Sequence, residues 1–273
     1  MIIEKSQNDI ILKNVKCLSL DLTLDCGEAF RWEKQADGSW SGTAYNRFLN
    51  IKEENGSFIL KNTSEKDFDE IWRTYFDLDR DYEAICKKIG KDRLVAEAMQ
   101  EYYGIRILNQ EPWEALVSFV ISQQNNIKRI KGIIKRLCAA YGEEIAPGIY
   151  GFPSAEKLSS LYVEDFEALG MGYRAKYVKR LADEVACGRL NLDEIKNMNI
   201  DDARRALLGI YGVGIKVADC ALLFGFGFLE CFPVDVWMKR VLEYYPNGLP
   251  ECFKGYEGIA QQYLFHWARN NLN

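Results

Sequence analysis

A hairpin hinged by glycine, between two helical patterns, constrains this chain more than any other feature. Gly212 and Gly214 flank a valine in the run LGIYGVGIKV, and glycine allows a positive φ and a close approach of the backbone to another molecule. Residues 201–208 and 215–224, on either side, have the residue patterns of helices. We therefore predict a helix-hairpin-helix over residues 201–224.

The hairpin itself is open to two interpretations. Backbone N–H groups of Gly212, Val213 and Gly214, next to a helix N-terminus, suit a phosphate group. A tight turn that only joins two helices is the simpler alternative. The three residues alone leave both open.

Lys216 lies in the first turn of the second predicted helix. The helix dipole disfavours a cation there, and apolar neighbours such as Val217 and Ala218 add desolvation, which also lowers the pKa of an amine. Such an amine can attack a sugar carbon and form a Schiff base. A lysine that extends its ammonium into water is the alternative, and position alone does not decide between them.

Asp235 follows Pro233 and precedes a third helical pattern, VWMKRVLEYY. We expect the Asp235 carboxylate to cap the N-terminus of that helix. The same carboxylate, held ionised, can stabilise positive charge on a sugar ring opposite Lys216. Capping and catalysis do not exclude each other.

These residues carry a family resemblance. Residues 208–220 followed by Pro233-Val234-Asp235 resemble the helix-hairpin-helix and Gly/Pro-Asp signature of a DNA glycosylase superfamily, and within it the lyase-active 8-oxoguanine DNA glycosylases. Four further blocks resemble that family in the same order along the chain: CGEAFRW at 26–32, SF…NNI…R at 118–129, LGMGYRAKY at 169–177 and AQQYLF at 260–265.

The resemblance implies a base excision repair enzyme whose partner is double-stranded DNA containing 8-oxoguanine. Lys216 would attack C1′ of the flipped nucleotide and expel the base, and Asp235 would stabilise the developing charge on the sugar. The resulting Schiff base would permit β-elimination and nicking at the abasic site.

Four residues would form the base pocket by the same resemblance. The carbonyl of Gly27 would accept the N7–H that 8-oxoguanine has and guanine lacks, a difference of ~1–3 kcal/mol. Cys220 and Phe265 would sandwich the base, and Gln261 would address its Watson–Crick edge. Without the resemblance, we would interpret these residues as a turn glycine, two core residues and a surface amide.

Four other residues would act on the opposite strand. Tyr173 would fill the space of the flipped base, and Gln124, Arg129 and Arg174 would contact the estranged base. Without the resemblance, Tyr173 and Arg174 are a helix-start pair on a solvated turn.

The chain departs from the family pattern at three positions. Residues 123–126 read QQNN where three consecutive Asn are usual, so the extra methylene of Gln124 leaves the preference for cytosine open. Trp237 stands where His is common, and a phosphate contact is lost there or passes to the indole N–H. Tyr211 stands where Pro is common, and we expect it to change hairpin stiffness more than chemistry.

The histidine and cysteine content limits which metal cofactors the chain can bind. The chain has a single His and no CxxC, which argues against a zinc site. Related glycosylases with an iron–sulfur cluster carry four closely spaced cysteines near the C-terminus, where this chain has only Cys252, so we expect no cluster and no required cofactor. The eight cysteines should be reduced and mostly buried. The resemblance adds one monovalent cation, K or Na, on the backbone carbonyls of Leu208, Ile210 and Val213.

The net charge of −5 argues mildly against a DNA-binding protein. The distribution of charge matters more than its sum, because a run from Lys128 to Arg136 has five cations, no acid and interleaved isoleucines. This pattern predicts an amphipathic helix with one basic face. A face that is only solvated is the alternative.

Residues 1 to about 62 contain alternating and β-branched segments, among them DIILKNV, LSLDLTL and RFLNIKEE. We predict an antiparallel sheet of about five strands there, and helices from Ser64 onward, which gives an α+β class. As domains we expect 1–105, a β-rich part with the helices that follow, and 106–273, a helical glycosylase region.

No apolar run approaches the ~20 residues of a membrane span, and the N-terminus lacks a signal-peptide layout. We therefore expect no membrane partner and a cytoplasmic protein, associated with the nucleoid in a bacterium or nuclear in a eukaryote. A monomer is the default expectation.

Two other functions stay open. A monofunctional alkylated-base glycosylase of the same fold would use an Asp like Asp235 but has no need of Lys216. A non-catalytic helix-hairpin-helix DNA-binding protein would explain Gly212, Gly214 and the basic helix, but needs neither Lys216 nor Asp235. A mismatch adenine glycosylase is disfavoured by the missing cysteine cluster.

Overall fold

The computed structural model describes residues 1–272, and the chain folds as two compact units. The first consists of residues 1–41, 49–109 and the segment from 228 onward, and the second of 42–48 and 110–227. The expected domains, 1–105 and 106–273, remain a prediction about chain segments. The compact units have other boundaries, because the C-terminal segment belongs with the N-terminal sheet.

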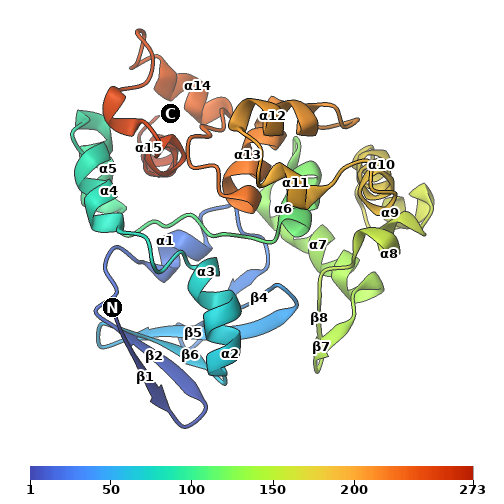
Figure 1. Ribbon diagram of the computed structural model, residues 1–273, viewed down its shortest axis with the longest axis horizontal. Coiled ribbons are helices and arrows are strands. Elements are labelled where there is room, and N and C mark those ends of the chain that lie inside the picture. The colour runs from blue at the N-terminus through green and yellow to red at the C-terminus, as the bar shows by residue number, and fades with distance from the viewer. Residues whose placement is uncertain (273) are drawn as a thin grey trace. The chain divides into compact units, whose positions relative to one another are not determined.

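The expected antiparallel sheet is confirmed, with six strands in the order β1-β2-β6-β5-β4-β3 (Figure 1). Side chains alternate in burial along β2 and β6, and the register places Ile10 opposite Leu60 and Leu12 opposite Phe58. The strands are β1 Ile2–Ser6, β2 Asp9–Lys13, β3 Trp32–Lys34, β4 Trp40–Ala44, β5 Arg47–Glu54 and β6 Ser57–Lys61.

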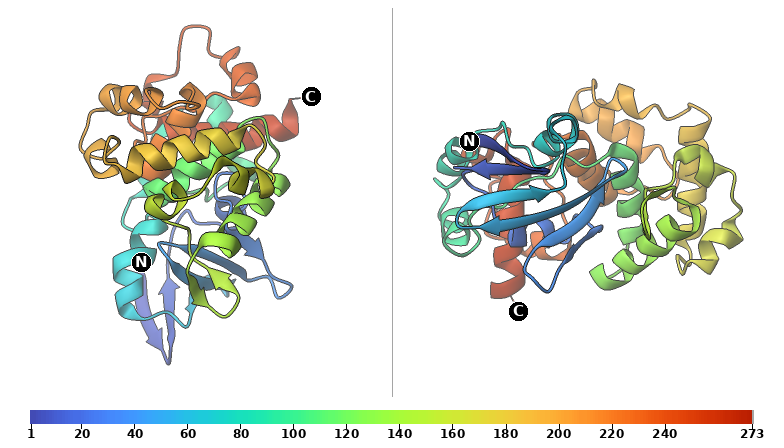
Figure 2. Two further views of the ribbon diagram at one scale, coloured as in Figure 1. Left: turned by 90° about the vertical axis from the view of Figure 1, so that its right-hand side faces the viewer. Right: turned by 90° about the horizontal axis from the view of Figure 1, so that it is seen from below.

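Two details of this sheet differ from the prediction. The segment LSLDLTL, expected as a strand, contains the short helix α1, Leu20–Leu24, because the Ser19 side chain caps it by accepting the N–H of Leu22. The additional strand β1 pairs with β2 at the edge of the sheet (Figure 2), and all its residues are exposed. Strand β1 therefore lacks the alternating burial that predicts strands.

Helices complete the first unit. Helix α15 packs against α5 and α14 (Figure 1), and four aromatic rings cluster at Trp32, Trp72, Tyr75 and Phe76. The helical segments are α2 Glu65–Asp67, a π-helical turn Phe68–Trp72, α3 Arg73–Tyr75, α4 Tyr82–Ile89, α5 Arg93–Glu101, α14 Val236–Leu242, a 3₁₀ turn Glu251–Phe253 and α15 Glu257–Asn271.

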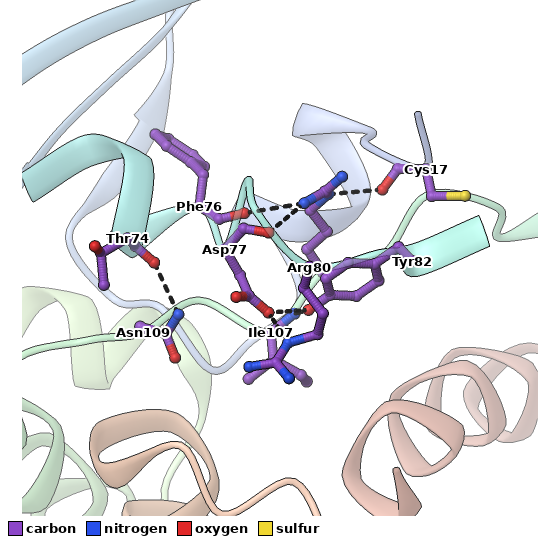
Figure 3. Close-up of polar contacts among 9 residues, drawn as sticks. Cys17, Thr74, Phe76, Asp77, Arg80, Tyr82, Ile107 and Asn109 are labelled. Carbon is purple, nitrogen blue, oxygen red and sulfur yellow. Dashed lines mark hydrogen bonds and ion pairs between the residues drawn. The ribbon is translucent and has the colours of Figure 1, made fainter. Parts of the chain in front are cut away.

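The buried Arg106 ties three segments of the first unit together. Its guanidinium donates to the carbonyls of Lys16, Cys17, Phe76 and Asp77 and lies 4.4 Å from the centre of the Tyr82 ring. Figure 3 shows the accepting carbonyls of Cys17, Phe76 and Asp77, and the Asp77 carboxylate that accepts the Tyr82 hydroxyl. Backbone carbonyls outside regular structure thereby gain donors.

The second unit is mostly helical. Helix α13 packs along α6, α12 packs on α13, and α10 contacts α6, α8 and α9. Gly225 faces Ala115 where α13 meets α6. The elements are α6 Pro112–Ser122, α7 Ile127–Tyr141, β7 Glu144–Ala146, β8 Ile149–Tyr150, α8 Ala155–Ser159, α9 Val163–Ala168, α10 Arg174–Ala186, α11 Leu192–Ile195, α12 Ile200–Leu208 and α13 Ile215–Phe226.

Within residues 1–272, none of the helices combines the length and the apolar character that a bilayer span requires.

Candidate functional site

The predicted helix-hairpin-helix is confirmed as α12, a tight hairpin and α13. Asn199 caps α12 by accepting the N–H of Asp202. The two helices are joined by a mostly buried ion pair, in which Arg204 Nε lies 2.7 Å from Asp219 Oδ1. Desolvation by burial raises the pKa of Asp219, and the Arg204 pair opposes that shift.

The two glycines of the hairpin differ in backbone conformation and in the space around them. Gly212 has a φ of +87°, and a Cβ there would overlap the ring of Tyr177. The fold of the protein itself therefore requires glycine at this position. Gly214 has a φ of −92° and caps α13, and a Cβ there would meet no atom within 4 Å. A positive φ therefore accounts for the glycine at position 212 but not for the one at position 214. Nothing inside the second unit explains why Gly214 lacks a side chain.

Lys216 lies in the first turn of α13, on the face that packs against α6. Its Nζ is 5.6 Å from the centre of the Phe119 ring, and the side chain is half-buried. Cys220, one turn further along α13, is 1% exposed, and Phe224, after another turn, stacks on Phe119 with ring centres 5.6 Å apart. Apart from the ammonium of Lys216, the face that these residues share is apolar.

The residues expected to act on the opposite strand lie close together in the second unit. Gln124 has a left-handed backbone with a φ of +46°. Arg174 is 3% exposed, and its guanidinium donates to the carbonyls of Gln123 (Nε, 2.7 Å) and Gln124 (Nη2, 2.9 Å). The interpretation of Arg174 as part of a solvated turn is therefore wrong, whereas Tyr173 is 46% exposed. Arg174 holds the turn that presents Gln124.

Gln123 was noted in the sequence only as a departure from a family pattern, but it joins three parts of this site. Its Nε2 donates to the carbonyl of Gly212 at 3.0 Å and to that of Val120 at 3.2 Å. Its own carbonyl accepts the Tyr173 hydroxyl at 3.3 Å and the Arg174 guanidinium. Gln123 thus connects the end of α6, the hairpin and the start of α10. No local pattern indicates a bond between residues 123 and 212.

The amphipathic character of helix α7 is confirmed. Ile130, Ile133 and Ile134 are buried, and four of the five cations in the run 128–136 are exposed. Arg129 Nη2 donates to the carbonyl of Gly170 at 3.1 Å. Arg136 donates to the carbonyl of Leu169 from Nε and Nη2, at 3.0 and 2.7 Å. Two cations of the basic run thus bind the last carbonyls after α9, where cations are favourable.

Asp235 and Gln261 both belong to the first unit. Asp235 caps α14 as expected, because its Oδ1 accepts the N–H groups of Trp237 at 2.9 Å and Met238 at 2.8 Å. Gln261, on α15, is 3% exposed, and its Nε2 donates to the carbonyl of Pro233 at 3.2 Å. The interpretation of Gln261 as a surface amide is therefore wrong. The candidate base reader and the candidate catalytic carboxylate belong to one packed group.

The first unit contains two other residues expected in the base pocket, Gly27 and Phe265. Gly27 has a φ of +83°, which explains glycine in this loop. Burial raises the pKa of the neighbouring Cys26 thiol to about 12, and the charge of Glu28 adds to the shift. Phe265, one turn after Gln261 on α15, is half-buried, and the Arg269 guanidinium lies 5.4 Å from the centre of its ring.

Trp237, where the family often has His, lies in the first turn of α14. The Arg240 guanidinium is 5.2 Å from the centre of its ring. A cation over an indole ring is a favourable arrangement. This pair places one positive charge beside the capped end of α14.

The expected site for a monovalent cation consists of backbone carbonyls. In residues 1–272, no group of three or more His, Cys, Asp or Glu could hold a metal ion. The eight cysteines are free and six of them are buried, which confirms the expectation of mostly buried thiols. Leu208 is the last residue of α12, and Ile210 and Val213 follow in the turn of the hairpin, where the Ile210 carbonyl accepts the N–H of Val213 at 3.1 Å. Neutral carbonyl oxygens are a donor set that fits a monovalent cation.

Two family models match almost the whole chain. Residues 10–116 match the model described as 8-oxoguanine DNA glycosylase, N-terminal domain. Residues 117–249 match the model described as HhH-GPD superfamily base excision DNA repair protein. The second match contains the helix-hairpin-helix, Lys216 and Asp235.

Solved structures and a curated relative agree with these matches. The chain is similar to an 8-oxoguanine glycosylase/lyase of Clostridium acetobutylicum in complex with dsDNA containing cytosine opposite 8-oxoG, with 36% identity, a TM-score of 0.93, and coverage of 99% of this chain and 98% of that one. MBOgg1 in complex with a low affinity DNA ligand is 38% identical, with a TM-score of 0.93 and coverage of 98% of both chains. The N-glycosylase/DNA lyase of Saccharomyces cerevisiae is 36% identical over 61% of this chain. This chain spans 48% of the length of the yeast relative. The chain therefore belongs to the 8-oxoguanine DNA glycosylase family, within the HhH-GPD superfamily of base excision DNA repair proteins.

Proposed function

We propose that this protein is a bifunctional DNA glycosylase and abasic-site lyase that removes 8-oxoguanine from duplex DNA. The observation that carries the proposal is the position of Lys216, two residues after Gly214, on the otherwise apolar face of α13 beside Phe119. A monofunctional glycosylase or a binding module of this fold needs no amine there. The names of the Clostridium and yeast relatives describe the same two activities.

Covalent chemistry at Lys216 accounts for both steps. The unprotonated Nζ attacks C1′ of the flipped nucleotide, the bond from C1′ to the base nitrogen breaks, and the base leaves with the bonding electron pair. The ammonium formed at Nζ gives one proton to the departing base. The sugar ring then opens as its oxygen takes up a proton from water, which gives a protonated Schiff base. Removal of a C2′ proton then expels the 3′ phosphate by β-elimination, and the strand is nicked.

Asp235 is the carboxylate that stabilises positive charge on the sugar during base loss. Its Oδ1 is fixed by two backbone N–H groups of α14, so the carboxylate is preorganised and needs no reorganisation when charge develops. The hydrogen bond of Gln261 to Pro233, two residues before Asp235, holds the proposed base reader against the same segment.

The backbone of the duplex is proposed to bind at the hairpin. The open space at Gly214 and the start of α13 suit a phosphate, because a helix N-terminus offers N–H donors and a favourable dipole. Tyr211 and Ile215, on either side of the glycines, are exposed apolar side chains. A monovalent cation on the carbonyls of Leu208, Ile210 and Val213 would add positive charge facing the DNA.

Recognition of the two bases is assigned to separate groups. Gly27, Cys220, Gln261 and Phe265 are proposed to hold the flipped 8-oxoguanine, which must leave the stack at a cost of a few kcal/mol. On the opposite strand, Tyr173 fills the gap, and Gln124, Arg129 and Arg174 meet the estranged base.

An end-labelled duplex with 8-oxoguanine opposite cytosine tests the proposal. Wild-type protein should release the base, detected as alkali-labile sites, and should also nick the strand without alkali. Lys216→Gln should do neither, and an undamaged guanine duplex should stay intact. Release of 3-methyladenine without 8-oxoguanine would support the monofunctional alternative. Duplex binding without release of either base would support the non-catalytic one.

A further inference from the structure

A hollow beside the hairpin takes no part in the proposed catalysis or base recognition. It has a volume of about 430 Å³ and lies within the second unit, between α9, α10 and the hairpin. Its lining carries three cations and one acid: Val163, Lys176, Lys179, Arg180, Asp183 and Tyr211. In a chain of net charge −5, an excess of cations around one concavity indicates an anionic ligand.

The three cations differ in how far they are engaged. Lys179 Nζ donates to Asp183 Oδ1 at 2.6 Å and to the carbonyl of Ser159 at 2.9 Å. Arg180 Nε lies 3.0 Å from Glu184 Oε1. Lys176 is exposed and has no hydrogen bond or ion pair to any residue from 1 to 272. Lys176 is therefore the cation of the hollow that can bind an external anion without breaking an internal pair.

Tyr211 is held at the rim of the hollow although it is 65% exposed. Its ring meets that of Tyr177 edge to face, with centres 5.3 Å apart, and Tyr177 meets Tyr173 in the same way at 5.7 Å. The row of rings leads from the proposed wedge, Tyr173, to the hollow. Tyr211 also directly precedes Gly212, so the hollow and the hairpin N–H groups are adjacent.

We propose that this hollow binds a backbone phosphate of the duplex, in addition to the phosphate at the hairpin, with Lys176 as its direct cationic ligand. Phosphates recur every few ångström along a strand, so a strand held at the hairpin carries another within reach. Tyr211 supplies a hydroxyl donor at the rim, which gives a function to a residue that replaces the more common proline. The proposal rests on the proposed function only in taking duplex DNA as the partner.

The salt dependence of DNA binding tests the proposal. The probe is a fluorescent duplex with a tetrahydrofuran abasic analogue opposite cytosine, which cannot be excised, titrated in KCl from about 50 to about 200 mM. Lys176→Ala should lower the magnitude of the slope of log K against log salt by about 0.9, the value for one phosphate contact. The matched control is Lys157→Ala, an exposed lysine on α8 outside the lining of the hollow, and it should keep the wild-type slope.

A second variant should change binding in the opposite direction. Asp183→Asn removes the acid that engages Lys179, so it should tighten binding and steepen the slope. A purely structural role of the Lys179–Asp183 pair predicts no gain in affinity. The proposal is overturned if Lys176→Ala and Lys157→Ala have equal slopes while thermal unfolding shows both folded.

Excision separates this proposal from the proposed function. At sub-saturating enzyme, single-turnover release of 8-oxoguanine should fall in Lys176→Ala in proportion to its loss of DNA affinity, and Lys157→Ala should match the wild type, because the hollow binds backbone and does not touch the reacting sugar. If the wild type fails to release the base but the slopes still differ, the proposed function fails and the phosphate site stands. If release occurs but the slopes are equal, the phosphate site fails alone.

Discussion

Replacing each hairpin glycine with alanine separates a glycine required by the fold from one left open for a partner. At Gly214 the backbone has a φ of −92°, and an added Cβ meets nothing within 4 Å. Alanine there should change the free energy of unfolding by less than ~1 kcal/mol, because its smaller freedom in the unfolded chain is stabilising, whereas alanine is a poorer N-cap residue than glycine. At Gly212 the φ is +87°, and the Cβ overlaps the Tyr177 ring.

Gly212→Ala should therefore be the destabilising member of the pair. The left-handed backbone costs alanine ~1–2 kcal/mol, and displacing the Tyr177 ring adds ~1–3 kcal/mol of overpacking. Urea unfolding measures both variants against the wild type.

DNA binding should separate the two variants further. If a phosphate approaches the start of α13, the methyl of Gly214→Ala displaces it and weakens a charge-assisted hydrogen bond of ~1.5–3 kcal/mol, which is about 10- to 100-fold in affinity. Fluorescence anisotropy with the abasic-analogue duplex gives this number. Wild-type affinity in a folded Gly214→Ala would refute the reasoning, as would a loss of stability as large as that of Gly212→Ala.

Three further predictions concern positioning, packing and pH. Gln123→Met keeps the side-chain length but cannot donate to the Gly212 carbonyl, which lies 3.0 Å from Gln123 Nε2. The rate of single-turnover excision should therefore vary less with the base opposite 8-oxoguanine than in the wild type. An unchanged dependence on the opposite base would contradict a positioning role of Gln123. Arg106→Met leaves four backbone carbonyls without a donor and should lower the free energy of unfolding by ~3–5 kcal/mol, whereas a loss below ~1 kcal/mol would contradict the packing argument. Burial, with the nearby Arg269 charge, lowers the pKa of His266 from 6.5 to about 4, so the unfolded chain binds the extra proton first and stability should fall as the pH drops from 6.5 towards 4. Urea unfolding at several pH values should show this fall to be smaller in His266→Gln, and equal falls would contradict the assignment.

The parts of the fold that sequence could predict are those set by local chemistry. The helix-hairpin-helix follows from glycines, caps and apolar spacing within residues 201–224, and the structure places its helices within two residues of the prediction. The Asp235 cap follows from a carboxylate directly before a helical pattern. Neither prediction depends on a distant segment.

The parts that sequence could not predict depend on distant partners or on solvent. Strand β1 is exposed along its whole length, so it has no hydrophobic pattern, and its pairing with β2 is made by backbone. Arg174 and Gln261 are buried polar residues whose hydrogen-bond partners lie 51 and 28 positions away. The bond from Gln123 to Gly212 spans 89 positions. Such contacts follow from tertiary packing, which overrides local preference.

Borohydride trapping tests the central claim, that Lys216 is the nucleophile, most directly. Wild-type protein and Lys216→Gln are incubated with borohydride and a duplex containing 8-oxoguanine opposite cytosine, and covalent protein–DNA adducts are counted on a denaturing gel. We expect an adduct with the wild type and none with Lys216→Gln, since borohydride converts the Schiff base of a lysine to a stable amine and so leaves the protein attached to the DNA. An adduct that persists in Lys216→Gln, or base release by the wild type without any adduct, would contradict it.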